Sequence, residues 1–140
     1  MDYSKVLNID IGKAVCYSGY RKGQTPGEIF PTYNQVKEDL LIINKTWKYI
    51  RLYSCDFHSR TVLEVIKNEK LDLKVMLGCY IEAEVNNYAC PWGGEYSDDQ
   101  LKINKKRNLE RIDLLSELGN KYPKIIFSLS IGNEACVSWT

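Results

Sequence analysis

The sequence has no long apolar run, no surplus of one charge and a single histidine. No segment approaches the roughly 20 consecutive apolar residues that a membrane-spanning helix requires, and the N-terminal residues lack the apolar core of a secretory signal. Nineteen basic and eighteen acidic residues give a net charge of +1, so bulk electrostatics favour neither nucleic acid nor a membrane surface as a partner. These features predict an ordinary soluble globular protein.

The sequence also lacks cysteine and histidine pairs at the spacings typical of metal ligands. The five cysteines contain no C-x-x-C pair, and the one histidine, His58, has no ligand-like spacing to any of them. We therefore expect no zinc site, and the sequence implies no other metal and no organic cofactor. Cysteines in or beside predicted strands act as small apolar residues. Unpaired thiols and the missing signal peptide together favour a cytoplasmic location.

Apolar segments that alternate with amphipathic ones dominate the rest of the chain. Strands are predicted at 13–18, 49–53, 73–80 and 125–131, where apolar and β-branched residues cluster. Three helices are predicted between them from their N-terminal signals: a capping box of Thr32 with Gln35, a cap at Ser59, and a second box of Ser97 with Gln100. The last helix is expected to bury Leu101, Leu109, Ile112, Leu115 and Leu118.

The order β-α-β-α-β-α-β predicts parallel strands, because connections of this length pass through a helix. Two α/β architectures fit: a small doubly wound sheet, or the N-terminal half (strands 1–4) of a (β/α)8 TIM barrel. The loop after the first strand has no glycine-rich phosphate motif, so nucleotide binding has no support. A whole barrel needs about 250 residues. We therefore expect residues 1–140 to form an incomplete barrel domain that ends just after strand four.

Glu134 is the principal catalytic candidate. It follows the apolar segment 125–131 directly, with Asn133 beside it. In barrels, catalytic groups lie at the carboxyl ends of strands. A partly desolvated glutamic acid there can stay protonated and donate to a leaving oxygen, while the amide bonds a sugar hydroxyl. The simpler interpretation of Gly-Asn-Glu is a polar turn that caps a following helix.

Aromatic residues are predicted at the same edge, and one arginine lies inside a predicted strand. Tyr17, Tyr53 and Tyr80 lie near the ends of three strands, and Trp92 lies in the long 81–96 loop. Flat aromatic faces there can stack on sugar rings, although strand tyrosines are often half-buried core. Arg51 lies within an apolar strand, so a carboxylate partner is expected for it, either catalytic or structural.

Other charged groups near strand ends are weaker candidates. Asp56, Glu82 and Glu84 are interpreted as loop charges or helix caps, although Glu82 or Glu84 with Glu134 would make a self-contained small enzyme. His58 beside Ser59 cannot form a catalytic triad.

With these residues identified, the chain resembles glycoside hydrolase family 17, the β-1,3-glucanases and β-glucan glucosyltransferases. The similar segments are Val15-Cys16-Tyr17, Ile50-Arg51-Leu52-Tyr53, Lys74-Val75-Met76-Leu77-Gly78, Cys90-Pro91-Trp92-Gly93-Gly94 and Ile131-Gly132-Asn133-Glu134. The resemblance implies a (β/α)8 barrel and a retaining mechanism on β-glucan. It implies Glu134 as general acid/base, and Asn133, Arg51, Tyr17 and Tyr53 as substrate-facing residues.

The family's nucleophile is a glutamate on strand seven, which has no counterpart here. Since a retaining glycosidase needs two carboxyl groups about 5–5.5 Å apart, the 140-residue chain alone is predicted to be inactive. Exposed strand edges predict self-association. Hydrolysis and transglycosylation stay open, as does a non-catalytic β-glucan-binding half-barrel or an inactive gene fragment.

Overall fold

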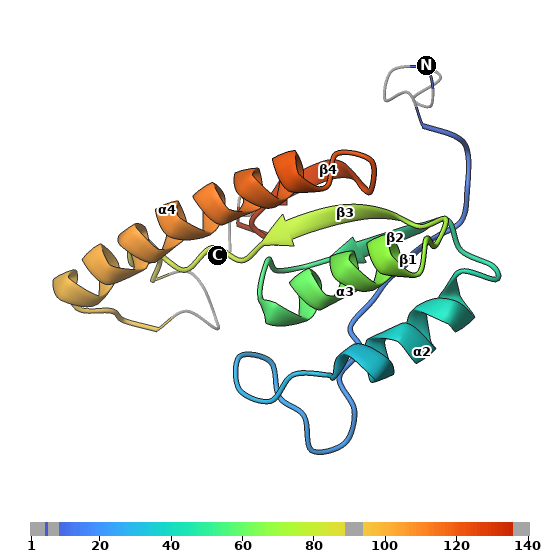
Figure 1. Ribbon diagram of the computed structural model, residues 1–140. Helices are drawn as coiled ribbons and strands as arrows, with labels where there is room; N and C mark the ends of the chain where they lie inside the picture. Colours follow the sequence, from blue (N-terminus) through green and yellow to red (C-terminus); the bar gives the residue numbers. More distant parts are fainter. Residues whose placement is uncertain (1–4, 6–8, 89–93, 136–140) are drawn as a thin grey trace.

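The structure is a computed structural model that describes residues 5, 9–88 and 94–135. Helices and strands alternate in it, as predicted (Figure 1). The elements, in chain order, are β1 (Ala14–Cys16), α2 (Tyr33–Ile43), β2 (Tyr49–Leu52), α3 (Phe57–Asn68), β3 (Lys74–Cys79), α4 (Asp98–Lys121) and β4 (Ile126–Ile131).

The four strands of the described residues form one parallel sheet in the order β1-β2-β3-β4. This arrangement confirms the predicted parallel α/β half-barrel-like fold. A register shift opposite Val75 and Met76 inserts one extra residue into β4, so that Ile126 pairs with Val75 while Ser128 pairs with Met76. The extra residue is Phe127, and it packs edge-on against Tyr49 of β2, with ring centroids 5.2 Å apart.

The hydrophobic core lies between one face of the sheet and the three helices. Ile50, Leu52, Val75, Leu77 and Cys79 supply the sheet side and are at most 1% exposed. They form one cluster with apolar residues of the helices, namely Val36, Leu40, Val62, Leu63, Val65, Ile66, Leu115 and Leu118. Side chains alternate along a strand, so Arg51 and Met76 lie on the opposite face, which is half-buried.

The helix starts follow two of the three predictions. Thr32 caps α2 with a full capping box to Gln35, and Ser97 caps α4 by accepting from the Gln100 amide. The prediction for α3 was wrong: the cap is Asp56, whose carboxylate accepts from the backbone N–H of Ser59 at 3.0 Å. Ser59 lies inside the first turn instead. Asp and Ser are both good N-cap residues, so the sequence offered two competing starts three residues apart.

Of the five apolar residues predicted on helix α4, four are buried or half-buried and Leu109 is exposed. Leu115 and Leu118 are buried, but Leu109 is 57% exposed. Two asparagines are buried in its N-terminal half, Asn104 and Asn108. Asn108 donates to the Glu82 carbonyl and accepts from the Glu82 N–H, and Asn104 donates to the Ala83 carbonyl. These side chains satisfy the backbone of the β3–α4 loop, a role that apolar periodicity does not reveal.

No helix among the described residues is long and apolar enough to cross a membrane.

Candidate functional site

The predicted site residues of β2 and β4 come together at the carboxyl edge of the sheet. An Nη atom of Arg51 donates to Oδ1 of Asn133 at 3.1 Å. The guanidinium also lies over the Tyr53 ring, with 4.6 Å between its central carbon and the ring centroid. These three side chains come from two strands that are not neighbours, since β3 lies between β2 and β4. The contacts therefore form one cluster, Arg51–Tyr53–Asn133.

The predicted carboxylate partner of Arg51 was wrong. Arg51 is half-buried, and it forms no ion pair with any residue in the described ranges. The guanidinium instead contacts the amide of Asn133 and the ring of Tyr53. An amide and an aromatic ring can take the place of a carboxylate beside arginine, because a guanidinium stacks on aromatic rings and keeps part of its hydration. Within the described ranges, the Arg51 guanidinium is thus held by an amide and an aromatic ring.

Glu134 lies beside this cluster in a tight turn. Its φ of 58° and the φ of 75° at Gly132 are both left-handed, a conformation uncommon for residues other than glycine. A side chain at position 132 would come within 2.7 Å of Ala135 Cβ, so glycine is required there. Glu134 is exposed, whereas partial desolvation was expected. The strained turn sets the direction in which the carboxyl group leaves the end of β4.

The predicted aromatic platform is present in part. Tyr53 and Tyr80 are 42% and 56% exposed. Tyr17 is 9% exposed, and its hydroxyl donates to Asp39 of α2 at 2.9 Å. Burial and the Asp39 carboxylate raise the pKa of Tyr17 well above its usual range. Tyr17 therefore belongs to the helix-facing interior and not to the exposed edge. Trp92 lies outside the described residues.

Cys16 lies at the same edge, although the sequence analysis treats strand cysteines as small apolar residues. It is exposed at the end of β1 and pairs in register with Arg51. The Cys16 side chain is the largest cause of a raised pKa of the Tyr53 hydroxyl. Cys55 and Cys79, in contrast, are buried as expected. Strand alternation puts Cys16 on the face opposite Val15, but β1 has only three residues from which to recognise it.

The other acidic candidates hold the scaffold together. Glu82 accepts from Arg111 at 3.3 Å and lies 3.9 Å from Arg107. Glu84 accepts from Asn108 at 3.0 Å, and Asp56 caps α3. These contacts agree with the interpretation as loop and cap charges. Because Glu82 and Glu84 are held against α4, they give a self-contained two-carboxylate enzyme no support.

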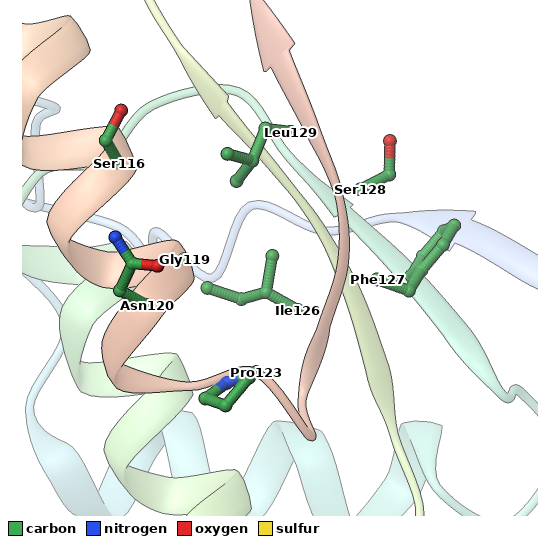
Figure 2. Close-up of a pocket in the computed structure, with 8 residues that line it drawn as sticks. All are labelled: Ser116, Gly119, Asn120, Pro123, Ile126, Phe127, Ser128 and Leu129. Atoms are coloured by element: carbon green, nitrogen blue, oxygen red, sulfur yellow. The ribbon is translucent and has the colours of Figure 1, made fainter.

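Two hollows in the surface of the described residues lie away from this edge. A groove of about 480 Å³ runs between α4 and β4 (Figure 2). Ile126 and Leu129 point into it toward α4, while Phe127 and Ser128 point to the other side of the strand. A second hollow lies at the opposite, amino-terminal edge beside Lys48 and Lys74. Neither is lined by a predicted site residue. In the part of the chain that the structure describes, no cluster of three or more His, Cys, Asp or Glu could hold a metal.

Comparisons with known proteins give one informative match. No protein-family model matches the chain, and no curated protein matches it by sequence. An endo-laminarinase from Formosa Hel1_33_131 has a similar structure, with a TM-score of 0.68 and 24% sequence identity. The match covers 91% of this chain and 32% of the laminarinase chain. The chain thus has the fold of about one third of that structure, and at this identity the likeness concerns the fold.

Proposed function

We propose that this chain is part of a retaining glycoside hydrolase of (β/α)8 architecture that acts on β-1,3-glucan, with Glu134 as general acid/base. Residues 1–140 would form its first four strands. The observation that carries the proposal is the 3.1 Å hydrogen bond between Arg51 and Asn133. It joins two of the residues implied by the family resemblance, from two separate strands, beside the third, Glu134. The likeness in fold to the endo-laminarinase supports the same proposal.

Each side chain of the edge has a task in this proposal. The exposed face of Tyr53 stacks on a sugar ring, since aromatic faces bind the apolar faces of pyranoses. Asn133 keeps its amide N–H groups for a sugar hydroxyl, because its oxygen already accepts from Arg51. Arg51 fixes the amide orientation and supplies positive charge. Trp92 stays a predicted aromatic contact to the glucan, while Tyr17 acts only through its packing against α2.

Glu134 would protonate the leaving glycosidic oxygen and then deprotonate the incoming water or sugar acceptor. The first step needs its protonated form, and the exposed side chain is open to water. Bound glucan would exclude that water. A retaining reaction also needs a second carboxylate as nucleophile, about 5–5.5 Å away, which the proposal assigns to a later strand. The chain spans 32% of the laminarinase chain, and we propose that it has no hydrolytic activity by itself.

A non-catalytic β-glucan-binding half-barrel is the second candidate, and one observation favours it. Glu134 is exposed, and the aromatic side chains of Tyr53 and Tyr80 are 42% and 56% exposed. Binding would then survive Glu134→Gln in any longer form of the protein. Catalysis would not survive it.

The direct test is an NMR titration of the isotope-labelled chain with oligosaccharides of β-1,3-linked glucose. We expect saturable shift changes at Arg51, Tyr53 and Asn133, and no release of reducing sugar from laminarin. Shift changes confined to the groove between α4 and β4, or none at all, would contradict the proposed site. Measurable hydrolysis by the chain would contradict the need for a second carboxylate elsewhere.

A further inference from the structure

The loop that follows β1, residues 17–31, is fastened at its start to α2 and α3. The backbone N–H of Gly19 donates to Nε2 of His58 at 3.3 Å. The Tyr17 hydroxyl donates to Asp39 at 2.9 Å, and the Arg21 guanidinium donates to Asp39 at 2.8 Å. The contact to His58 is the one whose acceptor changes its charge near neutral pH.

Gly19 fits closely against its acceptor. A Cβ atom built at position 19 would lie 2.3 Å from the Tyr17 hydroxyl oxygen and 3.0 Å from His58 Nε2. Real Cβ atoms essentially never lie closer than 3.0 Å to another heavy atom, so a side chain at position 19 would force the Tyr17 ring to shift. Glycine lets the backbone lie this near to both rings. The hydrogen bond from Gly19 to His58 therefore depends on the absence of a side chain at position 19.

His58 is buried on all sides, with 4% of its surface exposed. Its ring lies 5.4 Å from the Tyr17 ring and 5.2 Å from the Tyr20 ring, centroid to centroid. Two carboxylates face it, Asp56 from its own helix α3 and Asp39 from α2. The two tyrosines facing it from β1 and the loop are neutral, since burial raises both of their pKa values, that of Tyr20 to about 12.

Burial lowers the pKa of His58, and the two carboxylates oppose that shift only in part. At neutral pH the imidazole is consequently uncharged. Because Nε2 accepts from Gly19, the proton of the neutral ring must be on Nδ1. A protonated ring would carry a hydrogen on Nε2 as well. That hydrogen would point at the Gly19 N–H, and the bond would be replaced by a repulsion between two donors.

We infer that neutral His58 is a positioning residue that holds the loop after β1 at Gly19, and that protonation of His58 releases this loop in acid. Gly19 is three residues from Cys16, which pairs in register with Arg51. Release would therefore loosen the carboxyl edge of the sheet next to the Arg51–Tyr53–Asn133 cluster. The inference goes beyond the proposed function and does not depend on it.

The sequence makes the test unusually direct, because His58 is the only histidine in the chain. Its ring resonances can be followed by NMR without ambiguity, together with hydrogen-exchange protection of the Gly19 amide. Between about pH 7.5 and about pH 4.5 we expect that protection to fall by about tenfold or more. Its midpoint should coincide with the titration of His58, below the usual value of 6.5. The Val75 and Leu77 amides in the core should stay protected.

Two variants separate positioning from simple packing. His58→Gln retains a side-chain acceptor at every pH, so Gly19 should stay protected at acidic pH. His58→Phe keeps the ring contacts but has no acceptor, so protection should be low at every pH. Constant Gly19 protection through the wild-type His58 titration would overturn the inference, and so would an unchanged pH dependence in His58→Gln. If neither variant folds, the coincidence or separation of the two wild-type midpoints decides the question.

Discussion

Arg51 on β2 bonds to Asn133, which follows β4, across the intervening strand β3 at 3.1 Å. The two residues are 82 positions apart in the sequence. The contact forms because three parallel strands end at one edge, where the long guanidinium extends past β3. It makes the carboxyl edge a single constellation and is the structural basis of the proposed glucan site.

Gly78 of β3 is a sensitive position in this constellation. A Cβ atom there would lie 2.8 Å from the Leu52 carbonyl oxygen and 3.1 Å from the Tyr53 carbonyl. Gly78→Ala should therefore push the end of β2 away and cost about 1–3 kcal/mol in the free energy of unfolding. Urea denaturation measures this. Gly94→Ala is the matched control, since the nearest atom lies 3.5 Å away; equal stability of the two variants would contradict the close approach.

Tyr17 is predicted to contribute to stability through its hydroxyl. Tyr17→Phe removes the hydrogen bond to Asp39 and should lower the free energy of unfolding by about 1 kcal/mol. Tyr88→Phe changes a side chain that is 81% exposed and should alter stability by less than about 0.5 kcal/mol. Chemical denaturation of both variants distinguishes them. A Tyr17→Phe variant as stable as the wild type would show that the Asp39 contact carries no net energy.

The core and the outer surface of α4 should respond differently to truncation. Leu77 is fully buried between the sheet and the helices, so Leu77→Ala should cost about 2–5 kcal/mol through lost burial and a residual cavity. Leu109, which is 57% exposed, should tolerate the same change within about 0.5 kcal/mol. Thermal and urea unfolding report both values. A large loss for Leu109→Ala would instead restore the helix face expected from the sequence.

Cysteine labelling should follow exposure. Cys16 is exposed, whereas Cys55 and Cys79 are buried, and burial raises the pKa of the Cys55 thiol above its usual value. Since the thiolate is the reactive form, iodoacetamide at neutral pH should modify Cys16 at least about tenfold faster than Cys55. Peptide mass spectrometry resolves the sites. The difference should disappear in urea, and equal native rates would contradict the burial of Cys55.

Sequence patterns predicted the scaffold well where the signal was local. The Thr32 capping box, the four apolar strands and their parallel order needed only neighbouring residues and short-range rules. Failures came where a side chain found a partner far along the chain. Arg51 met an amide instead of a carboxylate, and the α4 asparagines turned inward to satisfy a loop backbone.

The candidate site shows the same difference between local signals and contacts far along the chain. Residue order at strand ends brings Tyr53 and Asn133 to one edge, where Arg51 contacts both of them. Alternation along β1 decides that Tyr17 packs on α2 while Cys16 faces the edge, but a three-residue strand gives little periodicity from which to judge this. The anchoring of the loop by His58 depends on a backbone donor 39 residues away, and no pattern of side chains indicates such a contact.

The most direct test of the proposed glucan site is calorimetric binding of β-1,3-linked glucose oligosaccharides to the chain and to Arg51→Met. We expect saturable binding by the wild type and an affinity at least about tenfold lower in Arg51→Met. This difference is equivalent to about 1.4 kcal/mol of binding free energy. Arg60→Met, which removes an exposed guanidinium on α3, should bind as the wild type does. No binding by the wild type, or equal affinity in Arg51→Met, would contradict the assignment of this edge as the glucan site.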